Sequence, residues 1–177
     1  GVSVIFAQLY GEKNFEKLRN ECFISIIMGV TTVMMLTVLG LMLINPLLRA
    51  MQTPDDVIIY VYNYMNIIFY GLIITFFYNW CSSVLRALGD TKTTLYTLMI
   101  AMILNFILDY VFVVNCNMGI RGTAIATVIS QLFSAVVCII YICHKYNYLV
   151  FRRKDMKLER GLARKTAKLG FVSALHQ

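Results

Sequence analysis

Three long stretches of this chain, residues 22–48, 57–85 and 122–143, carry no charged side chain. A fourth, residues 93–120, carries only Asp109. Each exceeds the roughly 20 apolar residues that a helix needs to cross the hydrocarbon core of a bilayer. Because the apolar runs are continuous rather than alternating, they favour helices over the strands of a membrane barrel. The sequence therefore predicts an all-α, polytopic membrane protein with four complete spans.

The composition agrees with this interpretation. Hydrophobic residues make up 59% of the 177 residues and charged residues only 14%, whereas soluble domains are about 25% charged. So much apolar surface argues against a soluble enzyme, a disordered chain or a disulfide-stapled secreted module. The five cysteines show no spacing typical of a metal site. We therefore expect no enzyme activity, no bound cofactor and no cysteine-bound metal.

Shorter apolar segments lie at both ends, in residues 1–10 and 169–177. They are predicted to be the end of an earlier span and the start of a later one, so the chain is expected to be a fragment. The Asn-Pro pair at 45–46 is predicted to close the first complete span. Thr53 is predicted to cap the second, with Pro54 at its first helical position.

Positive charge is distributed unevenly among the connections. Segments 11–21, 86–92 and 144–168 hold 14 of the 16 Lys and Arg residues, and segments 44–56 and 116–121 hold the other 2. Because cytoplasmic loops of membrane proteins are enriched in Lys and Arg, the first three segments are predicted to be cytoplasmic. The protein is expected to be a multi-pass protein of the plasma membrane.

The segment 144–168 alone contains nine basic residues. In isolation such a segment could bind nucleic acid. Beside a membrane, attraction to anionic lipid headgroups accounts for it better, at about 1 kcal/mol for each basic residue near the surface. Membrane lipids are therefore the expected partner, and nucleic acid is not.

Asp109 is the one charge within the predicted spans. A carboxylate at the centre of a membrane helix costs about 2.5–3.5 kcal/mol, so it persists where it faces a cavity or a partner. Asn105 lies one turn earlier on the same helix face. The pair predicts a proton- or cation-binding site, toward the outer side of the membrane. The alternative is an acid that stabilises helix packing.

The last complete span carries two rows at helical spacing. Its small residues predict a face that packs closely on another helix: Gly122, Ala126 and Ser130. A polar row lies beside them: Thr123, Thr127 and Gln131. Packing is the usual role of such residues, and ligand contact is the alternative.

Four segments resemble one known family, the multidrug and toxic compound extrusion (MATE) transporters. They are GVSVIFAQLYGEKNFEKL at the start, LRALGDTKT (85–93), LNFILDYVFV (104–113) and MGIRGTAIATVISQ (118–131). The resemblance covers essentially the whole chain. It implies that residues 1–144 are most of the N-terminal lobe, from part of helix 2 to helix 6. Residues 145–168 would then be the cytoplasmic connection between lobes, and 169–177 the start of helix 7.

The resemblance implies a twelve-helix bundle of two lobes that exports cationic amphiphilic drugs in exchange for H⁺ or Na⁺. The family's cation and proton site matches Asn105, Asp109 and Thr127, and Asn79 less closely. Na⁺ at Asp109 would be the only metal. The implied partners are cationic small molecules and the remaining helices of the full-length chain. Two features depart from the pattern: the helix 1 acid lies outside this sequence, and residues 170–172 read Gly-Phe-Val where the family has Gly-x-Pro.

Three rival functions agree less well with these residues. A lipid-linked oligosaccharide flippase of the same broad superfamily is expected to place several cationic residues in its cavity, and the predicted spans contain none. An intramembrane aspartyl protease needs two carboxylates that share one site, and only one lies within the spans. A non-transporting helical scaffold would have no use for Asp109.

Overall fold

The computed structural model of the protein describes residues 2–52 and 54–149, and these residues form helices joined by short connections. In chain order the helices are α1 (Val2–Gly11), α2 (Phe15–Ala50), α3 (Asp55–Ala87), α4 (Thr91–Tyr110), the π-helical turn η1 (Val111–Asn115), α5 (Ile120–Lys145) and the short 3-10 helix η2 (Asn147–Leu149). In the described part of the chain, four helices are long and apolar enough to cross a membrane. The predicted all-α membrane fold is confirmed.

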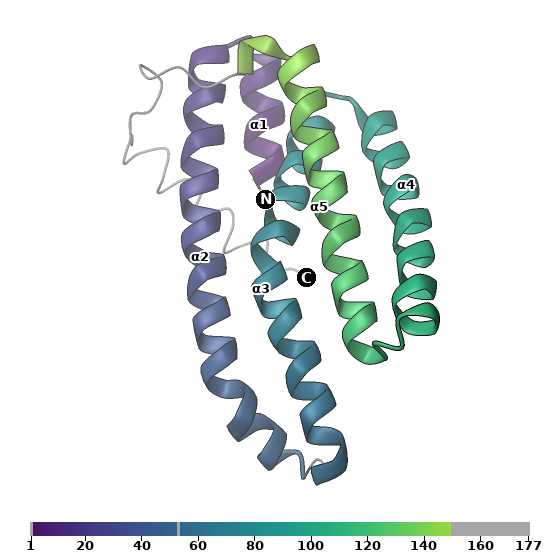
Figure 1. Ribbon diagram of the computed structural model, residues 1–177. Coiled ribbons are helices and arrows are strands. Elements are labelled where there is room, and N and C mark those ends of the chain that lie inside the picture. The colour runs from purple at the N-terminus through teal and green to yellow at the C-terminus, as the bar shows by residue number, and fades with distance from the viewer. Residues whose placement is uncertain (1, 53, 150–177) are drawn as a thin grey trace.

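The helix α5 lies between α3 and α4 and packs against both, while α2 packs against α3 (Figure 1). The start of α2, the end of α3, the start of α4 and the end of α5 all lie at one end of the bundle, the upper end in Figure 1. This is the end at which the basic connections meet, so we call it the predicted cytoplasmic end. At the opposite end α2 and α3 extend beyond α4 and α5.

A cluster of buried apolar side chains lies toward the predicted cytoplasmic end, where α1 joins α2, α3 and α5. Its members include Phe6, Leu9, Leu18, Cys22, Cys81, Leu85, Cys138, Ile142 and Leu149. Away from this cluster many large apolar side chains are exposed, especially on α2 and α4. Such outward apolar surface suits a helix whose surroundings are lipid.

Glycines allow the close approach of α2 and α3. A β-carbon on Gly29 would lie 2.0 Å from the ring of Phe76, and one on Gly40 would lie 2.3 Å from the ring of Phe69. The Thr37 hydroxyl also donates a hydrogen bond of 3.3 Å to the Phe69 carbonyl oxygen. Small residues let membrane helices approach each other closely, and α2 and α3 accordingly form a closely packed antiparallel pair.

The predicted small-residue face of α5 is confirmed as a packing surface. Gly122, Ala126 and Ser130 are all buried. A β-carbon on Gly122 would lie 3.0 Å from the β-carbon of Phe112 in η1. This face therefore lies against neighbouring helical segments.

Two predicted boundaries are wrong. The helix α2 continues through Pro46 to Ala50 instead of ending at the Asn-Pro pair. A proline so close to a helix end removes only one backbone hydrogen bond, and membrane helices tolerate this loss. Pro54 lies at the cap position before α3, not at its first helical residue, and the predicted cap Thr53 lies outside the described residues.

Most of the predicted connection between lobes, and the predicted partial span 169–177, lie outside the described residues. The first residues of this connection extend from α5 into η2. There Leu149 is buried, and the Arg19 guanidinium donates a hydrogen bond of 3.1 Å to the Tyr148 carbonyl oxygen. The chain that leaves α5 therefore lies against the start of α2.

Candidate functional site

The structure brings two of the predicted site residues together across the α4–α5 contact. The Asn105 side-chain amide donates a hydrogen bond of 3.4 Å to the Thr127 hydroxyl oxygen. The Thr127 hydroxyl in turn donates 2.9 Å to the Thr123 carbonyl oxygen one turn earlier. Thr127 is therefore oriented by its own helix to accept the bond from α4.

Asp109 lies one turn beyond Asn105 and is partly buried. Its Oδ1 atom is buried and accepts no hydrogen bond from any residue that the structure describes. A buried polar atom without a partner is uncommon in folded proteins and points to a specific role. For a carboxylate oxygen within a membrane helix, a proton or a cation is the natural partner.

The backbone changes its winding directly after Asp109. The α-helix ends at Tyr110 and continues as the π-helical turn η1, in which the Cys116 N–H donates to the Val111 carbonyl oxygen at 3.0 Å. Turns of this kind are rare and occur frequently at functional sites. Its position next to the buried carboxylate is an additional reason to regard this region as functional.

Asn79 is not in contact with the other three predicted residues. It is exposed on α3, and its amide donates 2.9 Å to the Thr75 carbonyl oxygen of its own helix. The Thr75 hydroxyl donates a hydrogen bond to the Gln131 side-chain oxygen on α5, and Gln131 follows Thr127 by one turn. Asn79 is thus related to Thr127 only indirectly, through the Thr75–Gln131 pair.

The ligand atoms at this site are of one chemical kind. In the described part of the chain, no group of three His, Cys, Asp or Glu side chains is placed to hold a metal ion. The Asp109 carboxylate and the Asn105 amide offer oxygen atoms. Oxygen ligands suit hard cations, whereas thiolates and imidazoles suit transition metals. A proton or an alkali cation fits this chemistry.

A second acidic side chain withdrawn from solvent was not predicted from the sequence. Glu21, which lies in the predicted cytoplasmic connection 11–21, is fully buried on α2. The helical spacing from Leu18 to Ser25, both also buried, places Glu21 on the inward face and could have revealed it.

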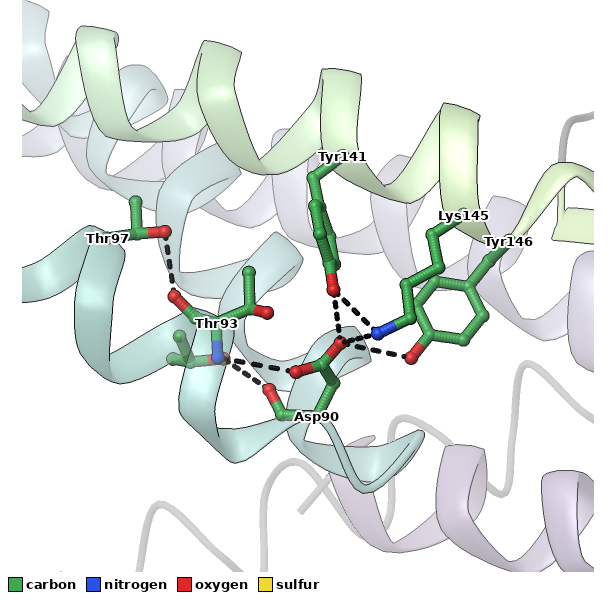
Figure 2. Close-up of polar contacts among 7 residues, drawn as sticks. Asp90, Thr93, Thr97, Tyr141, Lys145 and Tyr146 are labelled. Atoms are coloured by element: carbon green, nitrogen blue, oxygen red, sulfur yellow. Dashed lines mark hydrogen bonds and ion pairs between the residues drawn. The ribbon is translucent and has the colours of Figure 1, made fainter.

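The polar cluster around Asp90 was not predicted either, since the sequence indicates only a boundary between spans there. The Asp90 Oδ2 atom accepts hydrogen bonds from the Tyr141 hydroxyl at 2.7 Å, the Lys145 ammonium at 2.7 Å and the Tyr146 hydroxyl at 3.2 Å (Figure 2). We call these four residues the Asp90 cluster. The Asp90 Oδ1 atom accepts a hydrogen bond of 3.3 Å from the Thr93 N–H and so caps α4.

The neighbours of Asp90 stabilise its charged form. Partial burial by itself raises the pKa of Asp90, but the hydrogen bonds from Lys145, Tyr141 and Thr93 outweigh burial and hold that pKa well below its usual range. Burial and the nearby Asp90 charge raise the pKa of Tyr146. Asp90 is therefore a carboxylate, and Tyr146 a neutral phenol, throughout the physiological pH range.

The amino-acid sequence is similar to those of known membrane-transport proteins. Residues 1–111 match the family model MatE. The chain is 31% identical to the probable multidrug resistance protein YoeA of Bacillus subtilis (strain 168), over 99% of this chain and 40% of that protein. It is 25% identical to the probable multidrug resistance protein NorM of Thermotoga maritima, over 99% of this chain and 38% of that protein. The chain thus spans about 40% of the length of these relatives.

Solved structures show the same fold. The inward-facing conformation of a multidrug resistance MATE family transporter of the MOP superfamily matches 97% of this chain and 39% of its own, with a TM-score of 0.89 at 23% identity. A MOP superfamily transporter from Pyrococcus furiosus matches 99% of this chain and 39% of its own, with a TM-score of 0.90 at 23% identity. At this level of identity the likeness establishes the fold.

Proposed function

The chain belongs to the MatE family of multidrug and toxic compound extrusion transporters, and from this membership we propose that the complete protein is a drug antiporter. It is a multi-pass plasma-membrane protein and not an enzyme. We propose that residues 1–144 form most of its N-terminal lobe. The complete protein exports cationic amphiphilic compounds in exchange for H⁺ or Na⁺, by secondary active transport.

The observation that carries this proposal is the buried Oδ1 atom of Asp109, which accepts no hydrogen bond from the described residues. A carboxylate in this state gains from binding a proton or a cation. Coupling then requires only that the ion and the drug stabilise the inward- and outward-facing states to different extents. Asp109 supplies the charge that changes during the transport cycle.

Asn105 and Thr127 have supporting roles at the same site. The contact with Thr127 uses an N–H of the Asn105 amide, which leaves the amide oxygen available as an acceptor. That oxygen and the Asp109 carboxylate lie one helical turn apart on α4. Together they offer a cation two oxygen ligands of different charge, while Thr127 fixes the orientation of the amide. Asn79 remains a more distant candidate for this site.

The test is Asp109→Asn in the full-length protein, measured as ethidium efflux from vesicles energised by a proton or a sodium gradient. We expect export to be lost, while the amount of protein in the membrane stays at the wild-type level. Glu16→Gln is the matched control, because it makes the same change at an exposed carboxylate of α2, and it should export normally. Wild-type efflux by Asp109→Asn would contradict the assignment.

A further inference from the structure

We propose that Asp90 is a positioning residue for the Asn105–Thr127 contact: from the predicted cytoplasmic end it fixes how far α4 is displaced along α5. The inference rests on the proposed function of that contact, and it assigns a role to a residue that touches neither the ion nor the drug.

The carboxylate of Asp90 joins two helices through its two oxygen atoms. Oδ1 caps the first turn of α4 through the Thr93 N–H, and Oδ2 accepts hydrogen bonds from Tyr141 and Lys145 in the last two turns of α5 (Figure 2). The Asp90 side chain is only 11% exposed, whereas that of Lys145 is 51% exposed. The acid is therefore held inside the contact between the helices, and the lysine reaches it from the surface.

The Asp90 cluster and the Asn105–Thr127 contact both join α4 to α5, which run antiparallel, so both depend on the position of α4 along α5 (the register of the two helices). Asn105 follows Asp90 by 15 residues, and Thr127 precedes Tyr141 by 14 residues. With a rise of about 1.5 Å per residue, these separations are about 22 Å on α4 and about 21 Å on α5. A contact that fixes one point of this register consequently fixes the other.

The contact at the site is sensitive to small displacements. The Asn105–Thr127 hydrogen bond is 3.4 Å long, which is already beyond the usual range for such bonds. Sliding α4 along α5 by one residue would move Asn105 by about 1.5 Å and break the bond. The site therefore depends on whatever holds the register of the two helices.

Apolar burial cannot hold that register. The buried residues of α4 are Thr94 and Thr97, and most of its large apolar side chains are exposed. Between membrane helices there is no hydrophobic driving force, because lipid tails are as apolar as leucine, so hydrogen bonds and close packing decide the geometry. The ion pair of Asp90 with Lys145, at 2.7 Å, supplies such a contact at the predicted cytoplasmic end.

The first test measures the register directly and needs no drug. In the full-length protein carrying Asn105→Cys and Thr127→Cys, a short bifunctional thiosulfonate should bridge the two cysteines, with the linked peptides detected by mass spectrometry. We expect Asp90→Asn to reduce the cross-linking yield, because it removes the negative charge that pairs with Lys145. Asparagine is also a good helix cap, so the substitution leaves the cap of α4 in place. Lys145→Met should act in the same direction. Lys92→Met, at an exposed lysine of the same end of α4, should leave the yield unchanged.

The second test asks whether Asp90 acts through the site. Ethidium affinity of the purified full-length protein, measured by fluorescence polarisation, should fall about fivefold or more in Asp90→Asn, the lower range of coupling between distant sites. In a Thr127→Val background, where the acceptor hydroxyl is absent, Asp90→Asn should cause no further loss. Residues that act as one unit show this non-additivity.

The outcomes separate the two proposals. An unchanged cross-linking yield in Asp90→Asn and Lys145→Met would overturn the positioning role. The same affinity loss in the wild-type and Thr127→Val backgrounds would also overturn it, because it indicates general destabilisation. A reduced yield in a protein whose wild type does not export ethidium would support the positioning role and contradict the proposed transport function.

Discussion

The ring of Phe76 on α3 occupies the space in which a side chain on Gly29 of α2 would begin: ring atom Cε2 lies 2.0 Å from the position of a β-carbon there. Phe69 stands in the same relation to Gly40, three turns further along α2. The antiparallel pair of α2 and α3 therefore depends on two glycines, each of which accommodates one aromatic ring.

Replacing either glycine by alanine should destabilise the protein. Gly29→Ala and Gly40→Ala each force a phenylalanine ring or a helix to move, and overpacking of this kind costs about 1–3 kcal/mol. Thermal unfolding of the full-length protein in detergent measures the loss. The control is Gly11→Ala, where a β-carbon meets nothing within 4 Å. Equal melting temperatures for all three variants would show that the rings adapt without cost.

Two exposed cysteines test the predicted orientation. Cys116 lies in the connection between η1 and α5, and Cys143 lies near the opposite end of α5. In intact cells, a membrane-impermeant maleimide should label a variant that retains only Cys116, and should label a Cys143-only variant after permeabilisation alone. The buried Cys138 is the control and should resist labelling under both conditions. The reverse pattern would invert the assigned topology.

The Asp90 cluster should be insensitive to pH across the physiological range. Hydrogen bonds lower the folded-state pKa of Asp90. The contribution of its carboxylate to the stability of the folded protein is therefore complete above the pKa of an unfolded aspartate, about 3.9. It is lost only as the pH falls through the lower folded value. Between pH 5 and 8 the carboxylate facing Tyr141, Lys145 and Tyr146 does not titrate. The difference in melting temperature between wild type and Asp90→Asn, measured on the full-length protein in detergent, should therefore be the same at pH 5 and pH 8, and a difference that changes over this range would contradict this account.

The spans could be predicted from the sequence because lipid excludes unpaired charge, and stretches of more than 20 uncharged, mostly apolar residues are rare outside membrane helices. The helix ends could not be predicted in this way. The helix α2 begins at Phe15, before Glu21, and ends beyond Pro46, because a helix continues into the polar region wherever neighbouring helices support it. The absence of charge marks the apolar part of a helix and not its full length.

The candidate site was predictable only in part. The four-residue spacing of Asn105 and Asp109 places them on one face of any helix, so that pair follows from local geometry. The contact with Thr127, the exposure of Asn79 and the π-helical turn after Tyr110 depend on how α3, α4 and α5 pack. No local pattern specifies that packing.

Asp90 and Glu21 were missed for a related reason. Both acids lie in segments that the charge pattern assigns to aqueous connections. The charge count identifies a connection correctly, but it does not show which of its acidic side chains faces inward. For Asp90 the decisive partners, Tyr141 and Lys145, are more than 50 residues away in the sequence.

The position of α5 between α3 and α4 has a consequence for sequence variation. A larger side chain at a small buried position of α5, such as Ala126, disturbs the packing of a helix that has neighbours on two sides. Exchange of one apolar residue for another on the exposed surface of α4 leaves the contacts between the helices unchanged. Related proteins are therefore expected to diverge slowly along the buried positions of α5 and quickly along the exposed surface of α4.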